Sequence, residues 1–494
     1  MIPSLLSPGS PDAVQTVLLP HWIDPAAAFD LLYSGSSFAV WLDAGAGATT
    51  GMSYLAAAHD ASRVVTASAR AGTVTCTRPL RDAEAPVTTP GTIFDFLRAE
   101  LPPSTEPAAS APGTGFRLGW VGWLGYGLAQ SDAVPDRTSA DYAAPDAALL
   151  YVDRALAFDH AAGTVTLLAR AGAGEPPADI EAWLLDTSRL LGGQRHSAPA
   201  EPARQPREPG STAALEVRWR HDAERYARLI DACQDRIAAG DAYQLCLTNE
   251  VTVAGRFDPL TVYRRLRAGS PSHHGGLLRF GAHALLSASP EEFLTVSPAG
   301  TLRTRPIKGT RPRSADPAAD RMLRAELLAS DKERAENLMI VDLMRNDLGR
   351  VAALGSVAVT ALLQVESYPH VHQLVSTIEA RLAPGLSAVD AIEACFPAGS
   401  MTGAPKASAM SILRALEGGE RGVYAGAFGY LGLDGAVDLA MVIRSIVLGP
   451  AGASIGTGGG ITALSVADEE IEETRIKAAA LIEAISVNVS PVTS

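Results

Sequence analysis

The chain has 494 residues, of which 47% are hydrophobic and 19% are charged, so it is a folded protein too long for one small core. Its formal charge of −13, from 41 basic and 54 acidic residues, argues against a nucleic-acid-coating protein or one that binds an anionic membrane surface. The cysteines at 76, 233, 246 and 395 have no CxxC or metal-ligand spacing, which is typical of buried, inert thiols in a reducing cytoplasm.

The N-terminal segment, MIPSLLSPGSPD, has no basic region, and no apolar run in the chain approaches about 18 residues. We therefore expect neither a signal peptide nor a membrane span. The next 180 residues alternate short apolar runs with turn signals. The predicted elements are strands at 36–44, 62–69 and 72–78, a helix at 91–101, a glycine-rich strand at 116–128, a hairpin at 148–170 and a helix at 179–191.

Residues 192–214 are dense in Pro, Gly, Ser and Arg and lack apolar periodicity, which predicts a linker or exposed loop. This stretch divides the chain into an N-terminal part at 1–191 and a C-terminal part at 215–494. In the C-terminal part, helices and strands come in clusters and do not alternate strictly. That order favours an α+β fold with largely antiparallel sheets.

The C-terminal part begins with an amphipathic helix at 221–240, which Gly240 ends. A strand at 241–253 and a helix at 258–269 follow, and 283–309 reads as strand, turn, strand and an extended basic loop. Further predicted elements are strands near 356–365 and 371–377, a helix at 387–395, a loop at 396–406 before a helix, a hairpin at 422–448 turning at Asp434–Gly435, and a glycine-broken strand pair at 452–463.

Two acidic helices are predicted, at 331–350 and 468–485. Each places two glutamates three residues apart on one face: Glu333 with Glu336, and Glu470 with Glu473. Carboxylate pairs on two helices suit Mg²⁺, which prefers hard oxygen ligands. The spacing is equally compatible with two solvated faces and an ordinary Glu473–Lys477 ion pair, so it leaves both interpretations open.

Three features indicate a small anionic ligand. The glycine run 456–460, GTGGG, exposes backbone N–H groups, although such runs also mark tight turns. The loop that contains Ser400 and Thr402 precedes a helix and offers hydroxyls as well as amides. Arg444 lies in an apolar strand, where an arginine is either paired or available to grip a carboxylate.

Lys308 lies in the segment TRPIKGTRPR, with Arg305, Arg311 and Arg313 close by in sequence. Neighbouring cations and partial burial lower the pKa of a lysine and make its free amine available as a nucleophile. The alternative is a solvated basic loop. The segment alone does not separate the two.

A resemblance to the chorismate-utilising enzymes runs from about residue 225 to residue 488. It rests on these blocks, in this order: AGDAYQLCLTNEV, SASPEEFL, TRPIKGTRPR, ERAENLMIVDLMRNDLGRV, FPAGSMTGAPK, YAGAFGY, AMVIRSI, GTGGGI and EEIEETRIKA. The family includes component I of anthranilate synthase and of aminodeoxychorismate synthase, together with isochorismate and salicylate synthases. The resemblance implies one large α+β body, with two antiparallel β-sheets packed face to face and helices on the outside. It also implies that 215–494 is the chorismate-binding catalytic region.

The resemblance implies roles for individual residues. Glu336 and Glu473 are similar to the family's Mg²⁺ ligands, with Glu333 and Glu470 as helpers. The substrate-binding positions that it implies are Gln244, Ser400, Thr402, Tyr424, Arg444, Gly458, Gly459, Gly460 and Lys477. Family members that add water carry a lysine where this chain has Gln244, so the resemblance implies ammonia as the nucleophile.

Lys308 separates the ammonia-using members, because anthranilate synthases typically have alanine there and aminodeoxychorismate synthases have lysine. The resemblance therefore implies amination of chorismate at C4 to give 4-amino-4-deoxychorismate, for the p-aminobenzoate and folate branch. Lys308 would form a covalent intermediate and Glu291 would be the general acid/base. The alternative is an anthranilate synthase component I. Many relatives have a histidine where this chain has Gln373, with His372 next to it, so a proton-carrying histidine is in doubt there.

The ammonia needs a source. A glutaminase domain would carry a nucleophilic cysteine on a tight turn, and no cysteine of this chain has that context. We therefore expect a separate glutamine amidotransferase subunit, or the use of free ammonium. No nucleic acid or membrane partner is expected.

Overall fold

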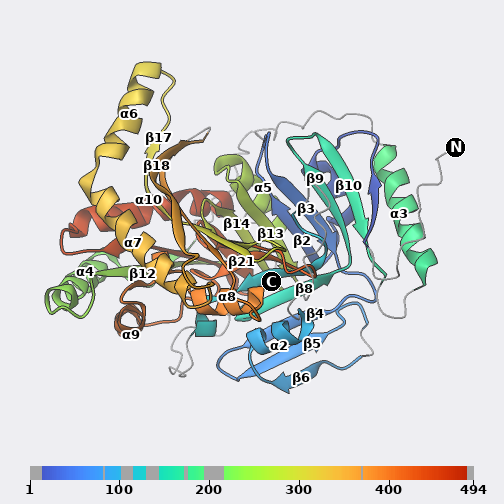
Figure 1. Cartoon of the computed structure of the whole chain (residues 1–494), viewed down its shortest axis with the longest axis horizontal. Coiled ribbons are helices and arrows are strands. Elements are labelled where there is room, and N and C mark those ends of the chain that lie inside the picture. The colour runs from blue at the N-terminus through green and yellow to red at the C-terminus, as the bar shows by residue number, and fades with distance from the viewer. Residues whose placement is uncertain are drawn as a thin grey trace.

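The computed structural model describes residues 14–81, 84–101, 115–129, 144–171, 176–193, 216–368 and 371–486. Within these ranges the strands form two large sheets, with helices on their outer faces (Figure 1). The fold expected from the resemblance, two antiparallel sheets packed face to face with helices outside, is confirmed.

The first sheet has twelve strands and combines segments from both ends of the chain. Adjacent strands run antiparallel, and β2 of the N-terminal part pairs directly with β13 of the C-terminal part. In spatial order the strands are β1 (Gln15–Leu18), β10 (Thr164–Ala169), β9 (Arg154–Asp159), β3 (Met52–Ala57), β2 (Phe38–Asp43), β13 (His274–Phe280), β14 (His283–Ser289), β23 (Ser445–Gly449), β24 (Gly452–Ile461), β12 (Gln244–Ala254) and β11 (Val217–Trp219), with β20 (Gly403–Ala404) paired to β12.

The second sheet also has twelve strands and the same mixed origin, since β7 pairs with β21. In spatial order its strands are β17 (Ile307–Pro312), β19 (Val371–Arg381), β16 (Thr301–Arg305), β15 (Glu292–Val296), β22 (Val437–Met441), β21 (Ala427–Gly432), β7 (Gly119–Leu124), β8 (Ala147–Val152), β4 (Val64–Ser68), β5 (Thr73–Thr77) and β6 (Val87–Pro90), with β18 (Ala358–Ser367) paired to β19. Both sheets thus join residues before 192 to residues after 214.

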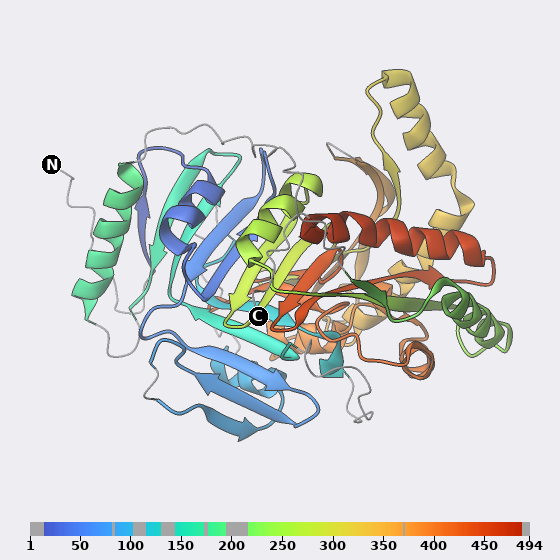
Figure 2. The same ribbon diagram turned by 180° about the vertical axis from the view of Figure 1, so that it is seen from behind.

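The helices of the described ranges lie on the outer faces of the sheets or at their ends. Their bounds are α1 (Pro25–Tyr33), α2 (Ile93–Glu100), α3 (Pro177–Gly192), α4 (Ala223–Ala238), α5 (Pro259–Gly269), α6 (Pro317–Ala329), α7 (Asp331–Gly349), α8 (Ala388–Cys395), α9 (Lys406–Glu417) and α10 (Ala467–Ser486). Figures 1 and 2 show α3 at one end of the molecule and α6 projecting from the other. None of these helices combines the length and apolar character needed to cross a lipid bilayer.

Alternating side chains of the strands build three apolar layers. The layer between the sheets contains Val40 and Leu278 from the first sheet and Trp123 and Phe428 from the second. A second layer lies under α1, α3, α5 and α10, and a third under α2, α7 and α8. The helices α7 and α10, which carry the acidic motifs, are therefore held by different sheets.

Most predicted elements are present within a few residues, but several predictions were wrong. The hairpins predicted at 148–170 and 422–448 each contain three strands, because the chain passes from one sheet to the other between β8 and β9 and between β22 and β23. Residues 452–463 were expected to form a broken strand pair, but β24 is one continuous strand, because it pairs with β12 through the whole glycine run. The segment after Pro306 was expected to be an extended loop, but it forms β17 against β19. The helices α1 and α6 and the strands β3 and β13 were not predicted. The expected linker at 192–214 lies outside the described residues from 194 onward.

Candidate functional site

One large cavity, of about 1500 Å³, lies where α7 and α10 face the ends of both sheets. Most of the site residues implied by the resemblance line it, although they come from well-separated parts of the chain. The lining members of that set are Glu291, Lys308, Glu333, Glu336, Ser400, Tyr424, Arg444, Gly458, Gly459, Gly460, Glu470, Glu473 and Lys477. Gln244 and Thr402 do not line the cavity.

The four glutamates, which we call the carboxylate cluster, each face a different basic side chain. Glu333 lies 3.6 Å from Arg311, Glu336 lies 3.7 Å from Lys308, Glu470 lies 3.6 Å from Lys332, and Glu473 lies 2.6 Å from Lys477. The first pair of glutamates is on α7, whose N-cap Ser330 accepts a hydrogen bond from the backbone N–H of Glu333. The cluster is thus neutralised by protein cations.

The pKa values of two glutamates in the cluster, Glu336 and Glu473, are shifted in opposite directions. Burial raises the pKa of Glu336, and the like charges of Glu333 and Glu470 add to the rise against the attraction of Lys308. For Glu473, burial also acts upward, but Lys477 outweighs it and the pKa is lowered. The structure therefore favours an added positive charge near Glu336 more strongly than near Glu473.

The donor set of the cluster fits a hard divalent cation such as Mg²⁺. All four donors are carboxylates on the wall of one cavity, and Gly459 leaves room between them. A Cβ atom at Gly459 would lie 2.9 Å from Glu470 Oε2 and 3.9 Å from Glu473 Oε1. In the described part of the chain, no three acidic, histidine or cysteine side chains lie close enough together to hold a metal ion. An ion would need oxygen ligands from substrate or water as well.

Lys308, on β17, lies inside the cavity, but its electrostatic surroundings differ from the prediction. Arg305 pairs with Glu366, and Arg313 pairs with Asp320, so they do not crowd Lys308. Burial acts to lower the pKa of Lys308, yet Glu336 and the other acidic groups around it outweigh burial, and the pKa is raised. The predicted lowering of this pKa was wrong. A protonated Lys308 needs a base before it can act as a nucleophile.

Glu291, between β14 and β15, can be that base. It is buried, and burial raises its pKa to about 7, even though Lys308 and the backbone N–H of Ile307 favour its charged form. A carboxyl with such a pKa exchanges protons near neutral pH. Glu291, the predicted general acid/base, is therefore close enough to Lys308 for the two charges to interact.

The glycine run lies in a continuous strand, where its missing side chains make room for neighbouring groups. In β24, Gly456 leaves room for the ring of Tyr424, whose Cγ would lie 2.0 Å from a Cβ atom there. At Gly460 a Cβ atom would lie 2.1 Å from Gln244 Nε2 and 3.4 Å from Lys308 Nζ. The missing side chain at Gly460 thus makes room for both Gln244 and Lys308 beside the strand.

Arg444 reaches the cavity from the start of β23. Its backbone has a φ of +50°, which is unusual for a residue with a side chain. No side chain in the described ranges forms an ion pair or hydrogen bond with its guanidinium. Arg444 is an exposed residue on the wall of the cavity. Arg444, beside Tyr424, is therefore a free cation that can receive a carboxylate of a ligand.

Gln244 Oε1 is a buried polar atom without a hydrogen-bond partner among the described residues. Ser400 faces the cavity, where its hydroxyl interacts with the carboxylate of Glu291 and favours its charged form. Thr402 is completely buried, and its hydroxyl donates to the carbonyl of Gly399. The unpaired oxygen of Gln244 is consistent with a ligand that would satisfy it.

Arg421, which the sequence reasoning missed, fixes this part of the wall. It donates to both carboxylate oxygens of Glu417 and to the carbonyls of Met401 and Cys246. The Ser400 turn and β12 are thereby held together. The guanidinium also lies 4.4 Å from the ring centre of Tyr126. An i, i+4 Glu–Arg pair around a glycine is the only sequence signal that could have indicated it.

Gln373, at the position where many relatives have histidine, lines the cavity from β19. His372 points to the opposite face of the strand, where it bonds Ser367 and Asp320. His372 therefore does not take the place of a histidine at 373. Among the described residues that line the cavity, His273 is the one histidine, and it lies on the loop between α5 and β13.

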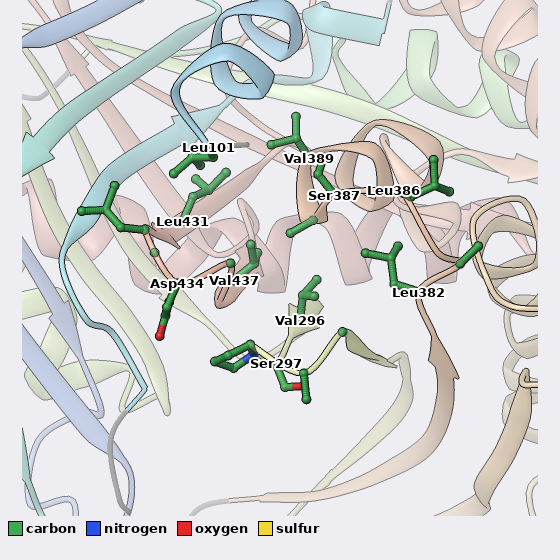
Figure 3. Close-up of a pocket in the computed structure, with 18 of the residues that line it drawn as sticks. Leu101, Val296, Ser297, Leu382, Leu386, Ser387, Val389, Leu431, Asp434 and Val437 are labelled. Atoms are coloured by element: carbon green, nitrogen blue, oxygen red, sulfur yellow. The ribbon is translucent and has the colours of Figure 1, made fainter. Parts of the chain in front are cut away.

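A second, smaller cavity of about 280 Å³ lies between the turns β15–β16 and β21–β22 and the loop before α8 (Figure 3). Polar and apolar groups contribute almost equally to its walls, and Leu382 and Leu431 are among the apolar side chains that line it. Its charged group is Asp434, whose carboxylate caps the backbone N–H of Ala436. Without a cation in its lining, this cavity does not suit an anionic substrate.

Comparison with curated proteins gives matches along most of the chain. It is 45% identical over 399 residues to an aminodeoxychorismate synthase of Streptomyces pristinaespiralis and 43% identical over 482 residues to one of Streptomyces griseus, matches that cover 80% and 96% of this chain. The chain spans 54% and 65% of the length of these two relatives. An anthranilate synthase component 1 of Streptomyces coelicolor is 38% identical over 403 residues, which are 80% of this chain and 78% of that protein.

Among solved structures, component I of anthranilate synthase from Streptococcus pneumoniae superposes with a TM-score of 0.71 at 28% identity. The match covers 94% of this chain and 98% of that one. The family model described as chorismate binding enzyme matches residues 40–483, which include every residue of the cavity wall named above. The chain belongs to the chorismate-binding enzyme family.

Proposed function

We propose that this chain aminates chorismate at C4 with ammonia to give 4-amino-4-deoxychorismate, as component I of an aminodeoxychorismate synthase. The observation that carries the proposal is Lys308, which lies inside the cavity between Glu336 and Glu291. Its surroundings are those of a reacting group and not of a solvated loop. The two aminodeoxychorismate synthases at 45% and 43% identity support the same choice.

The cavity wall supports a dicarboxylic substrate. We assign the free guanidinium of Arg444 and the adjacent Tyr424 to the enolpyruvyl carboxylate. Lys477, which donates to the carbonyl of Gly458, and the Gly458–Gly460 face are assigned to the ring carboxylate. Glu336 and Glu473 would hold Mg²⁺, with Glu333 and Glu470 helping through bound water, and the ion would supply Lewis-acid polarisation of the leaving hydroxyl.

The side chains supply the proton transfers. Lys308 gives a proton to Glu291, and its amine attacks C2 of chorismate as the C4–O bond breaks. Glu291 returns the proton to the departing hydroxyl, which leaves as water. Ammonia then attacks C4, the C2–N bond to Lys308 breaks, and Lys308 regains a proton from the new ammonium group. Gln244, which packs on Gly460 of the cavity wall and has an unpaired Oε1, is the residue that we assign to the incoming ammonia.

Analysis of the product by mass spectrometry tests the proposal. The purified chain is incubated with chorismate, MgCl₂ and ammonium chloride at raised pH, where free NH₃ is available. We expect a product that retains the enolpyruvyl group, and an adduct on the Lys308 peptide in samples quenched during turnover. Anthranilate and pyruvate as products would instead make the chain an anthranilate synthase component I.

The source of ammonia is tested separately. We propose that a separate glutamine amidotransferase delivers it. The purified chain should then use ammonium and not glutamine, and glutamine should become a donor only when an amidotransferase is added. Glutamine-dependent turnover by this polypeptide alone would contradict the proposal.

A further inference from the structure

The basic side chains around the carboxylate cluster differ in how firmly they are held. Lys477 has two close partners, Glu473 at 2.6 Å and the carbonyl of Gly458 at 2.7 Å. Lys308 is largely enclosed, with 16% of its side chain exposed. Lys332 has a single ion-pair distance, 3.6 Å to Glu470, and 45% of its side chain is exposed. Lys332 is therefore the most easily displaced of the three lysines.

Lys332 nevertheless lies where the negative charge is concentrated. Its ammonium is within electrostatic range of all four carboxylates of the cluster. The carboxylate that it faces most closely, Glu470, has only 4% of its side chain exposed, and its other partner is the neutral hydroxyl of Ser465. Removing Lys332 would leave Glu470 without a cation in contact, which is costly for a buried carboxylate.

The local helix does not explain a lysine at this position. Lys332 is in the first turn of α7, where the helix dipole favours acidic and disfavours basic side chains. The flanking Asp331 and Glu333 follow that preference. The position of Lys332 is thus explained by its ion pair with Glu470 on α10 more than by the preference of its own helix.

We propose that Lys332 is an internal counter-ion of the carboxylate cluster, which keeps α7 and α10 together until a divalent cation displaces its ammonium. The inference rests on the proposed metal role of the cluster. An ammonium and a divalent cation repel each other when both lie beside Glu470. Lys332 therefore weakens the binding of Mg²⁺ and stabilises the metal-free protein.

Isothermal titration calorimetry of the EDTA-treated protein with MgCl₂ tests this inference without any measurement of activity. Lys332→Met keeps most of the side-chain length and removes the charge. We expect its dissociation constant for Mg²⁺ to fall by about tenfold, because one repelling charge is lost from a partly screened site. Its unfolding temperature in EDTA should fall below that of the wild type, and MgCl₂ should restore it.

Two matched variants are the controls. Lys332→Arg keeps the charge and should bind Mg²⁺ as the wild type does. Arg334→Met makes the same change in net charge on the same helix, but Arg334 bonds the carbonyl of Leu328 and faces away from the cluster, so it should leave the affinity unchanged.

The outcomes separate this inference from the proposed function. Equal Mg²⁺ affinity in the wild type and Lys332→Met, or an equal gain in Arg334→Met, would overturn the role of Lys332 while the metal site stands. Absence of Mg²⁺ binding in the wild type and in Lys332→Met would overturn the metal site and this inference together.

Discussion

The helices α7 and α10 present the same motif, two glutamates three residues apart, and the structure treats the two motifs differently. On α7 the second glutamate, Glu336, is the buried one, whereas on α10 it is the first, Glu470. Glu336 faces a lysine from β17 across the cavity, at 3.7 Å, while Glu473 pairs with Lys477 one turn along its own helix, at 2.6 Å.

This difference sets the electrostatics of the two motifs. A local i, i+4 ion pair lowers the pKa of Glu473, and burial without a close partner raises that of Glu336. Equal spacing in sequence therefore does not mean equal charge behaviour. Lys308, which is distant in sequence, links the α7 motif to the proposed chemistry. Lys477 lies on the same helix as Glu473, so the ion pair of the α10 motif is formed within that helix.

The largest expected effect is a loss of turnover when one carboxylate is removed from either helix. Glu336→Gln and Glu473→Gln should each lower kcat by roughly a thousandfold or more, because both are assigned to the metal whose Lewis acidity contributes several kcal/mol. EDTA should abolish turnover of the wild type, and added MgCl₂ should restore it. Steady-state rates with ammonium measure both effects. Full activity of either variant, or of the wild type in EDTA, would contradict the assignment.

The next largest effects are on kcat and KM, when the two lysines that face these glutamates are replaced. Lys308→Ala should fold but lose at least about a hundredfold in kcat, since it lacks the proposed nucleophile. Direct attack of ammonia at C2 should give its minor product, aminodeoxyisochorismate. Lys477→Ala should mainly raise KM for chorismate, because Lys477 is assigned to substrate binding. Product analysis and KM values distinguish these results, and an unchanged kcat in Lys308→Ala would remove the covalent step.

The proton acceptor for Lys308 gives a smaller, pH-dependent effect. Because Glu291 has a pKa of about 7, kcat/KM for chorismate should rise as pH increases through that value, when the carboxylate form becomes populated. The profile must be recorded at a constant concentration of free NH₃, since that concentration also rises with pH. Glu291→Gln should lack this rise. A rise that persists in Glu291→Gln would assign it to another group.

The smallest expected effect is on the free energy of unfolding, measured in EDTA for one variant in each helix. The raised pKa of Glu336 means that the folded protein holds this proton more tightly than the unfolded chain, so its contribution is lost as pH rises above the ordinary glutamate value. Glu336→Gln should therefore gain stability relative to the wild type as the pH rises from 5 to 8. Urea unfolding at pH 5 and pH 8 measures the change.

Glu473 should behave in the opposite way. Its lowered pKa gives a contribution that is present above the ordinary glutamate value and is lost as pH falls through the folded-state pKa. Since nearly half of its side chain is exposed, Glu473→Gln should destabilise the protein at pH 8 by only about 0.5 kcal/mol or less. Equal shifts of the same sign in both variants would contradict the contrast between the helices.

The sequence by itself determined the local elements and the list of site candidates. The acidic helices, the helix ended by Gly240 and the hairpin at Asp434–Gly435 follow from short-range signals, namely apolar periodicity, caps and turn residues. The resemblance in ordered blocks supplied the fold and the candidate residues, and most of those residues line one cavity.

Only the tertiary structure decided what surrounds each candidate. Arg305 and Arg313 are near Lys308 in sequence, yet each pairs elsewhere, and the carboxylate of Glu336 from α7 reverses the expected pKa shift. The glycine run was expected to break a strand pair, but it lies in one continuous strand that lets side chains approach closely. Charge interactions and close packing depend on distances across the fold, and these distances are set by how the two sheets bring separate segments together.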